Sequence, residues 1–104
     1  MINRKGRIGN WDYYNTNGLG LMEFLLWCED MNMSPVVAVF AGFTLDLQHY
    51  TGTSYPPDAM QGVLDEALGM LEYIMGDVST QYGAWRARDG HPKPFNVKYV
   101  SLQV

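Results

Sequence analysis

Apolar residues fill most of the segment that follows the polar run Asn15-Thr16-Asn17-Gly18. Short polar side chains can accept the free amide hydrogens at a helix start, so a helix is predicted over residues 19–31. Glu23 and Asp30 mark its polar side. The opposite face carries Leu21, Met22, Leu25, Leu26 and Cys28. This helix is expected to lie against a sheet with little of its surface exposed.

An uninterrupted apolar run covers residues 36–41, between Pro35 and Gly42. Because the run is continuous rather than alternating, it predicts a strand that is covered on both faces, as in parallel sheets. A second strand is predicted over residues 96–102. Between residues 43 and 57, Gly, Pro, Ser and Thr indicate a loop, and a long loop after a strand is a usual place for function.

From Asp58 onward, apolar residues recur at three- and four-residue intervals, which predicts a long amphipathic helix over residues 58–78. A shorter helix is predicted over residues 81–88, closed by Asp89-Gly90. The resulting order of helix, strand, helix and strand, without hairpin signals, indicates βαβ units and an α/β fold with a parallel sheet. Residues 7–10 are expected to be the tail of a preceding strand.

Length and charge exclude several classes of protein. The 104 residues form one segment, too short for a complete barrel of about 250 residues. The sequence has no internal repeat, no low-complexity tract and no linker, so we expect both ends to be cut from a longer fold. The net charge is −4, and cations cluster only at Arg4, Lys5 and Arg7, which argues against a nucleic-acid partner. No apolar run is long enough to cross a membrane.

Metal and cofactor chemistry finds no support in the sequence. Cys28 stands alone in an apolar run, so we expect a buried thiol without a disulfide. His49 and His91 lie far apart in loops and are expected to be surface or hydrogen-bonded histidines. Gly18-Leu19-Gly20 lacks the third glycine of a dinucleotide fingerprint. We therefore expect no metal and no cofactor.

The acidic residues do not form an obvious catalytic pair. All glutamates fall within predicted helices, where a solvated helix face is the commoner role; they are Glu23, Glu29, Glu66 and Glu72. Asp12 and Asp46 occupy loops, where a turn or capping role is commoner than catalysis.

The aromatic residues indicate a ligand-binding surface more clearly than the acidic residues indicate a catalytic pair. Trp11, Tyr13 and Tyr14 cluster before the first helix, where a loop of a parallel barrel opens on the ligand face, and flat rings there can stack on sugars. Packing over the rim of the barrel is the structural alternative. Separately, Asn32-Met33-Ser34 fits the three-residue N-glycosylation pattern, with Pro35 directly after it.

Three segments of the sequence carry a family resemblance, and they are GLGLMEFLLWCEDM, LEYIMGD and HPKPF. In order and spacing, these segments resemble the fungal α-L-arabinofuranosidases of glycoside hydrolase family 51. The resemblance extends from residue 6 to about residue 100. It implies a (β/α)8 barrel that removes terminal arabinofuranosyl groups from arabinan or arabinoxylan with retention and without metal or cofactor. Fungal members are mostly secreted, so an extracellular address is expected for the whole enzyme, although no signal peptide is visible here.

Two glutamates perform the chemistry in that family, and the resemblance places neither in this chain. The general acid/base follows the fourth barrel strand in a Gly-Asn-Glu motif, whose Gly-Asn positions fall on Gln103 and Val104. The acid/base would therefore follow Val104. Residues 101–104 read Ser-Leu-Gln-Val where the family has Glu-Ile-Gly-Asn, which resembles a frame or splice change. The nucleophile, after the seventh strand, is absent.

One substrate contact carries over. A tryptophan of the family lines the arabinose subsite, and Trp11 stands at the same spacing, thirteen residues before Phe24. The resemblance thus predicts part of a barrel, roughly the units around strands 2 to 4, that is inactive alone. The alternative is a truncated, non-catalytic carbohydrate-binding or interaction module that uses Trp11, Tyr13 and Tyr14. In either case the open sheet edges are expected to favour self-association.

Overall fold

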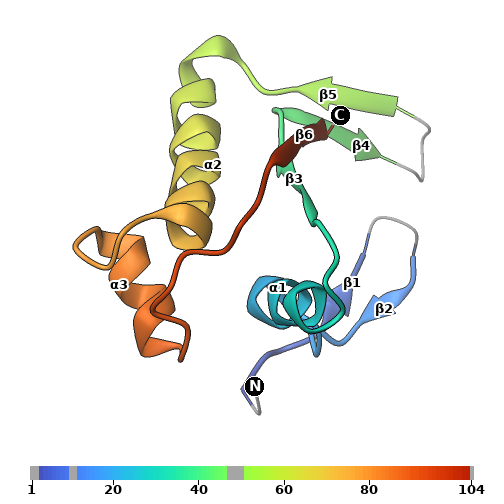
Figure 1. Cartoon of the computed structure of the whole chain (residues 1–104). Helices are drawn as coiled ribbons and strands as arrows, with labels where there is room; N and C mark the ends of the chain where they lie inside the picture. The colour runs from blue at the N-terminus through green and yellow to red at the C-terminus, as the bar shows by residue number, and fades with distance from the viewer. Residues whose placement is uncertain (1–2, 10–11, 47–50, 104) are drawn as a thin grey trace.

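A computed structural model describes residues 3–9, 12–46 and 51–103 (Figure 1). In chain order the elements are β1 (Arg7–Ile8), β2 (Tyr14–Asn15), α1 (Leu21–Asp30), β3 (Val36–Phe40), β4 (Phe43–Asp46), β5 (Thr51–Ser54), the 3-10 helix η1 (Pro57–Ala59), α2 (Met60–Met75), α3 (Gln81–Arg88) and β6 (Tyr99–Gln103). No helix among these residues is long and apolar enough to span a membrane.

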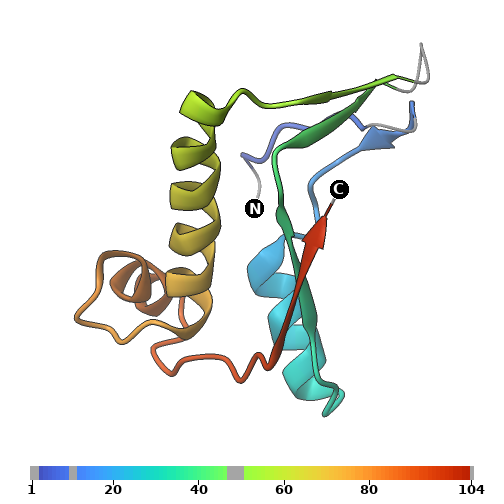
Figure 2. The same ribbon diagram turned by 90° about the horizontal axis from the view of Figure 1, so that it is seen from above.

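The parallel strands predicted for the two apolar segments are present. β3 and β6 pair in parallel, from Val36 opposite Tyr99 to Phe40 opposite Gln103. α1 and α2 pack against β3 of this pair, and α3 lies at the far end of α2 (Figure 2). The fold is therefore of the mixed α/β class, as predicted.

A small apolar core joins the helices to β3. Leu25 of α1, Val37 of β3, Ile74 of α2 and Phe95 form one buried cluster. Side chains alternate across a strand, so Val37 and Val39 lie inside while Val36 and Phe40 are 57% and 40% exposed. The prediction that this strand is covered on both faces is wrong for the described residues, because only one of its faces packs into the core.

The helix predictions are confirmed with small shifts. α3 has the predicted bounds, and its first residues are capped by the Thr80 hydroxyl, which accepts from the amide of Gly83 at 3.1 Å. α2 ends three residues earlier than predicted. α1 buries Leu25 and Cys28, yet Trp27 is 53% exposed. The expectation that α1 hides most of its surface is therefore wrong, because only a narrow stripe of it reaches the core.

The structure contains two antiparallel hairpins that the sequence did not signal. Residues 43–57, predicted as a loop, contain β4 and β5, paired from Phe43 opposite Ser54 to Asp46 opposite Thr51. Threonine fits a strand as well as a loop, and Thr44 also bonds to the carbonyl of Thr53. β1 is not the tail of a parallel strand, since it pairs antiparallel with β2.

A buried arginine ties the helices to the segment that leads into β6. Arg86 of α3 is fully buried, and its guanidinium donates to three backbone carbonyls. The acceptors are Tyr73 at 2.8 Å, His91 at 2.9 Å and Pro92 at 2.9 Å. The amide of Phe95 also donates to the carbonyl of Ile74. Together these bonds hold residues 91–95 against the end of α2.

Replacing Arg86 tests this arrangement. Arg86→Met keeps most of the side-chain volume but leaves three buried carbonyls without donors. The free energy of unfolding should therefore fall by roughly 3–5 kcal/mol. Urea denaturation followed by far-UV circular dichroism measures the change. Arg88→Met, at an exposed position of the same helix, is the control and should unfold like the wild type. Equal midpoints for the two variants would contradict the anchoring role.

Candidate functional site

The carboxyl ends of the two parallel strands form one edge of the structure. Phe40 and Gln103 are register partners at the ends of β3 and β6, and the amide of Ala41 donates to the carbonyl of Gln103 at 3.1 Å. The chain then turns at Gly42, whose φ of 86° favours glycine. Active sites of parallel α/β folds lie at this edge. We therefore take it as the candidate functional site.

The hairpin of β4 and β5 extends from this edge. The amide of Tyr55 donates to the carbonyl of Gly42 at 2.7 Å, which brings the end of β5 back to the end of β3. The rings of Phe40 and Tyr55 then meet edge to face, with centroids 5.4 Å apart. Apolar ring surface and backbone groups are what these residues offer to a ligand.

One glutamate, Glu66 of α2, lines a hollow beside Phe40 and Tyr55 of this edge. All four glutamates of the sequence lie within α1 and α2, as predicted. A retaining glycosidase needs two carboxyl groups about 5 Å apart, one to attack and one to protonate the leaving oxygen. The residues of this chain do not supply such a glutamate pair at the ends of β3 and β6.

The predicted aromatic cluster is only partly visible. Trp11 lies outside the described residues. Tyr13 and Tyr14 lie on the hairpin of β1 and β2 and are 79% and 66% exposed. The hydroxyl end of Tyr14 and the backbone carbonyl of Asn15 lie where a side chain at position 6 would be, which explains the glycine there. Both rings are thus accessible, although nothing in the described residues covers them on the opposite side.

Glu23 is not the solvated helix residue that the sequence predicted. Its carboxylate pairs with the Arg4 guanidinium through two contacts of 3.0 Å and also accepts from the amide of Gly20 at 2.7 Å. These bonds close the first turn of α1. The hydrogen bond from Arg4 is the main reason that the pKa of Glu23 lies below its usual value, and the amide of Gly20 lowers it further.

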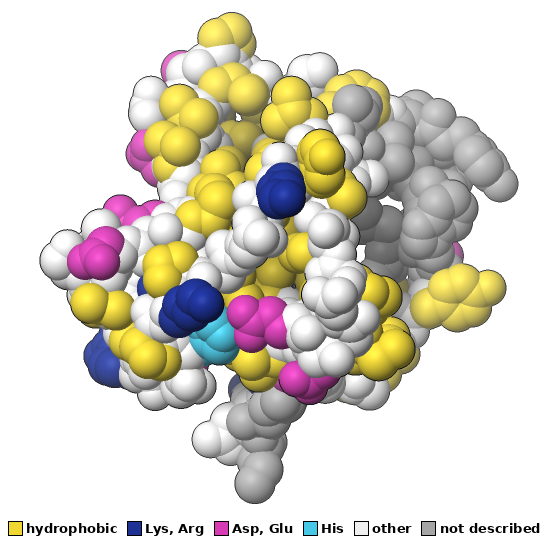
Figure 3. All heavy atoms as spheres, viewed as in Figure 1, with side chains coloured by type: hydrophobic (Ala, Val, Ile, Leu, Met, Phe, Trp, Pro, Cys, Tyr) yellow, Lys and Arg dark blue, Asp and Glu magenta, His cyan; other side chains and the backbone are white. Residues whose placement is uncertain are grey.

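Glu29 and His91 connect α1 to the segment that follows α3. His91 Nε2 lies 2.9 Å from Glu29 Oε2, its Nδ1 contacts the carbonyl of Lys93, and its ring stacks on Phe95 with centroids 3.9 Å apart. Figure 3 shows the histidine at the surface beside an acidic side chain. The prediction of a hydrogen-bonded histidine is confirmed for His91. His49 lies outside the described residues.

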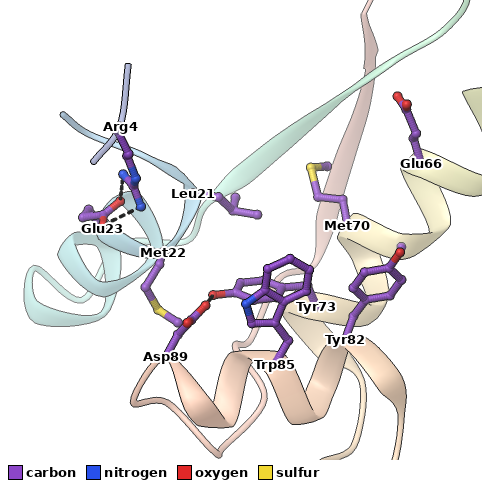
Figure 4. A pocket seen from close by; sticks show the side chains of 11 residues that line it. Arg4, Leu21, Met22, Glu23, Glu66, Met70, Tyr73, Tyr82, Trp85 and Asp89 are labelled. Atoms are coloured by element: carbon purple, nitrogen blue, oxygen red, sulfur yellow. Dashed lines mark hydrogen bonds and ion pairs between the residues drawn. The ribbon is translucent and has the colours of Figure 1, made fainter. Parts of the chain in front are cut away.

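A large hollow lies between α1, α2 and α3 (Figure 4). It measures about 700 Å³. The Tyr73 hydroxyl donates to Asp89 at 2.6 Å across it, and burial, together with this bond, raises the pKa of the hydroxyl. The Arg4–Glu23 pair lies at its other side. These polar groups bond to one another and join the helices, a role that the sequence pattern gave no means to foresee.

The structure also shows where Cys28 and Asp12 lie. Cys28 is a buried free thiol, as predicted. Asp12 occupies a turn with a φ of 58°, and its amide donates to the carbonyl of Gly9. Among residues 3–9, 12–46 and 51–103, no three His, Cys, Asp or Glu side chains gather as a metal site would require.

The described residues form a mixed α/β segment with one parallel strand pair, and the edge of that pair is its candidate site. A family model for the "Alpha-L-arabinofuranosidase 1 domain" matches residues 1–103. The chain therefore belongs to the α-L-arabinofuranosidase family, as its resemblance predicted.

Individual relatives agree with this assignment but are much longer. Alpha-L-arabinofuranosidase A of Aspergillus niger is 46% identical over 104 residues, which are 98% of this chain and 16% of that protein. The enzyme of the same name from Aspergillus kawachii is 47% identical with the same coverage. The chain thus spans about one sixth of the curated relatives it matches.

Solved structures give the same picture. An arabinose-bound family 51 α-L-arabinofuranosidase, MgGH51, superposes with a TM-score of 0.86 at 38% identity, covering 95% of this chain and 15% of that one. The α-L-arabinofuranosidase of Thermotoga maritima, in an arabinose complex, gives a TM-score of 0.71 at 33% identity and covers 95% and 17%.

The Arg4–Glu23 pair predicts a particular dependence on pH. A carboxyl whose pKa is lowered by folding stabilises the protein above its unfolded pKa, near 4.5, and loses that contribution as the pH falls through the folded value. Glu23→Gln should therefore lower the melting temperature at neutral pH. Between about pH 5 and pH 3, the melting temperature of this variant should also decrease less than that of the wild type. Thermal melts across that range measure both effects.

Glu66→Gln removes another carboxylate of the same hollow and is the matched control. It should retain the acid dependence of the wild type. An acid dependence that is unchanged in Glu23→Gln would show that the ion pair does not act in solution.

Proposed function

We propose that this chain is part of the catalytic (β/α)8 barrel of a retaining α-L-arabinofuranosidase, roughly the units around strands 2 to 4. The single observation that carries the proposal is the parallel pair β3–β6 with its joined carboxyl edge, in a segment that superposes on an arabinose-bound relative. Residues 1–104 form one incomplete segment of that barrel. The exposed face of β3 is then the one that the remaining strands of a barrel would cover.

The substrates proposed for the whole enzyme are terminal α-L-arabinofuranosyl groups of arabinan or arabinoxylan. Trp11 is the proposed substrate contact, and the general acid/base would follow Val104. An extracellular address fits a polymeric substrate that cannot enter a cell. Metal and cofactor have no part in the proposed reaction, because two carboxyl groups suffice for retention. No nucleic acid or membrane partner is proposed.

The 104-residue chain alone is expected to be inert towards arabinosides, because its glutamates all lie on helices and only Glu66 among them lines a hollow with Phe40, so no pair of carboxyl groups stands at the strand ends. A graft tests the proposal with activity as the readout. Residues 1–104 replace the matching segment of the Aspergillus niger enzyme, which is similar enough to accept them. Since residues 101–104 then stand at the catalytic edge, kcat/KM on an aryl α-L-arabinofuranoside should fall about 100-fold or more.

A second graft restores the family sequence at the same edge. It carries Ser101→Glu, Leu102→Ile, Gln103→Gly and Val104→Asn, and it should recover most of the lost activity. Circular dichroism confirms that both grafts fold like the parent. A folded second graft that stays inactive would contradict the proposal, and so would an unrestored graft with full activity.

The second candidate function is a non-catalytic carbohydrate-binding or interaction module. The observation that favours it is the exposure of Tyr13 and Tyr14, because exposed rings can stack on sugars. Titration of the 104-residue protein with arabino-oligosaccharides separates the two candidates. Binding that is lost in Tyr13→Ala would favour the module, whereas absence of binding favours a barrel segment.

Self-association is proposed through the open side of the β3–β6 pair. In the part of the chain that the structure describes, β6 pairs only with β3, and its Leu102 is 73% exposed. Hydrophobic side chains spread over much of the visible face (Figure 3). Unpaired strand edges and apolar faces template association with further copies.

Sedimentation velocity tests this prediction. The wild type should sediment as dimers or larger species at micromolar concentration, and Leu102→Lys should shift it towards monomer, since a charged edge resists pairing. Gln81→Lys adds the same charge at an exposed position of α3 and should leave the distribution unchanged. A monomeric wild type would contradict the proposal.

A further inference from the structure

The turn between α1 and β3 contains a feature that barrel chemistry does not use. Among the asparagines of the sequence, Asn32 alone is followed two positions later by serine or threonine. Asn32, Met33 and Ser34 form an Asn-X-Ser triplet with a residue other than proline in the middle, which is the acceptor pattern for N-glycosylation.

The structure fixes the backbone of this triplet. The amide of Asn32 donates to the carbonyl of Glu29 at 3.0 Å, and the amide of Met33 donates to the carbonyl of Cys28 at 2.8 Å. This is a Schellman motif, with Asn32 at the left-handed position after the helix and a φ of 53°. The turn is therefore formed by backbone bonds, and the Asn32 side chain is not needed to hold it.

The acceptor side chain is accessible. Asn32 and Ser34 are exposed. Within the described residues, the carboxamide of the Asn32 side chain makes no hydrogen bond. Met31 and Met33 beside it are 60% and 45% exposed. A glycan at this position would cover apolar surface instead of displacing a contact.

The turn also lies far from the candidate site. It precedes β3 at the amino end of the strand, whereas the candidate site is at the carboxyl end (Figure 2). A strand of five residues separates the two by about 15 Å. A bulky group on Asn32 would therefore project away from the edge where a substrate would bind.

We propose that Asn32 is an N-glycan acceptor. Its amide nitrogen bonds to the anomeric carbon of the first sugar of a lipid-linked oligosaccharide diphosphate. The bond from that carbon to the diphosphate oxygen breaks, the electron pair leaves with the lipid diphosphate, and the amide loses one proton. The inference rests on the extracellular route of the proposed function, because the donor is met on that route, but it does not depend on arabinoside chemistry.

Secretion of the 104-residue chain from a yeast, behind a host leader peptide, tests the proposal. Intact mass before and after enzymatic removal of N-glycans should show a glycosylated species, and peptide mapping should find Asp at position 32 after the glycan is removed. Asn32→Gly removes the acceptor but suits the left-handed turn. Ser34→Ala leaves the turn intact. Both variants should lose the glycosylated species, and Ser34→Thr should raise the glycosylated fraction.

The same masses are measured on protein recovered from the lumen of microsomes, so that poor secretion does not hide the result. Unmodified mass in both the wild type and Ser34→Thr, in medium and lumen, would overturn the proposal. A glycan that persists in Ser34→Ala would also overturn it. Because the readout is mass, it stands apart from the graft: loss of the glycan leaves the barrel proposal untouched, and an inactive graft leaves the acceptor site untouched.

Discussion

The buried guanidinium of Arg86 is the constraint on which the rest of the structure depends. A charge in an apolar interior is costly unless its donors are used, and here three carbonyls of Tyr73, His91 and Pro92 accept from it. These carbonyls belong to the end of α2 and to the segment before β6. The direction in which the chain enters β6, and hence its parallel pairing with β3, follows from this anchor.

The parallel pairing in turn creates the edge that we propose as the functional site. Phe40 and Gln103 end side by side, so whatever follows β6 in a longer chain starts next to the turn at Gly42. The helices cover one face of β3, whereas its other face and the residues of β6 are exposed. Both features fit a segment that forms part of a larger barrel, and the comparisons place the chain in a family of much longer enzymes.

Periodicity was sufficient for the helices and the two parallel strands, because long apolar repeats determine those elements. It failed for the hairpin of β4 and β5, since Thr and Gly suit loops and strands alike. It also failed at β3, where a continuous apolar run does not reveal whether a second layer is present. Arg86 and Glu23 carried no sequence signal, because their partners are backbone groups or residues distant in the chain. Trp11 remains a prediction.

Amide hydrogen exchange of the 104-residue protein tests most directly whether the anchored strand pairing exists in solution. The account predicts that β6 amides bonded to β3, and the Ala41 amide bonded to Gln103, exchange as slowly as the core amides around Ile74. Fast exchange along β6 beside a protected α2–α3 unit would contradict it. In that case the helices would fold without the strand edge on which the proposed function depends.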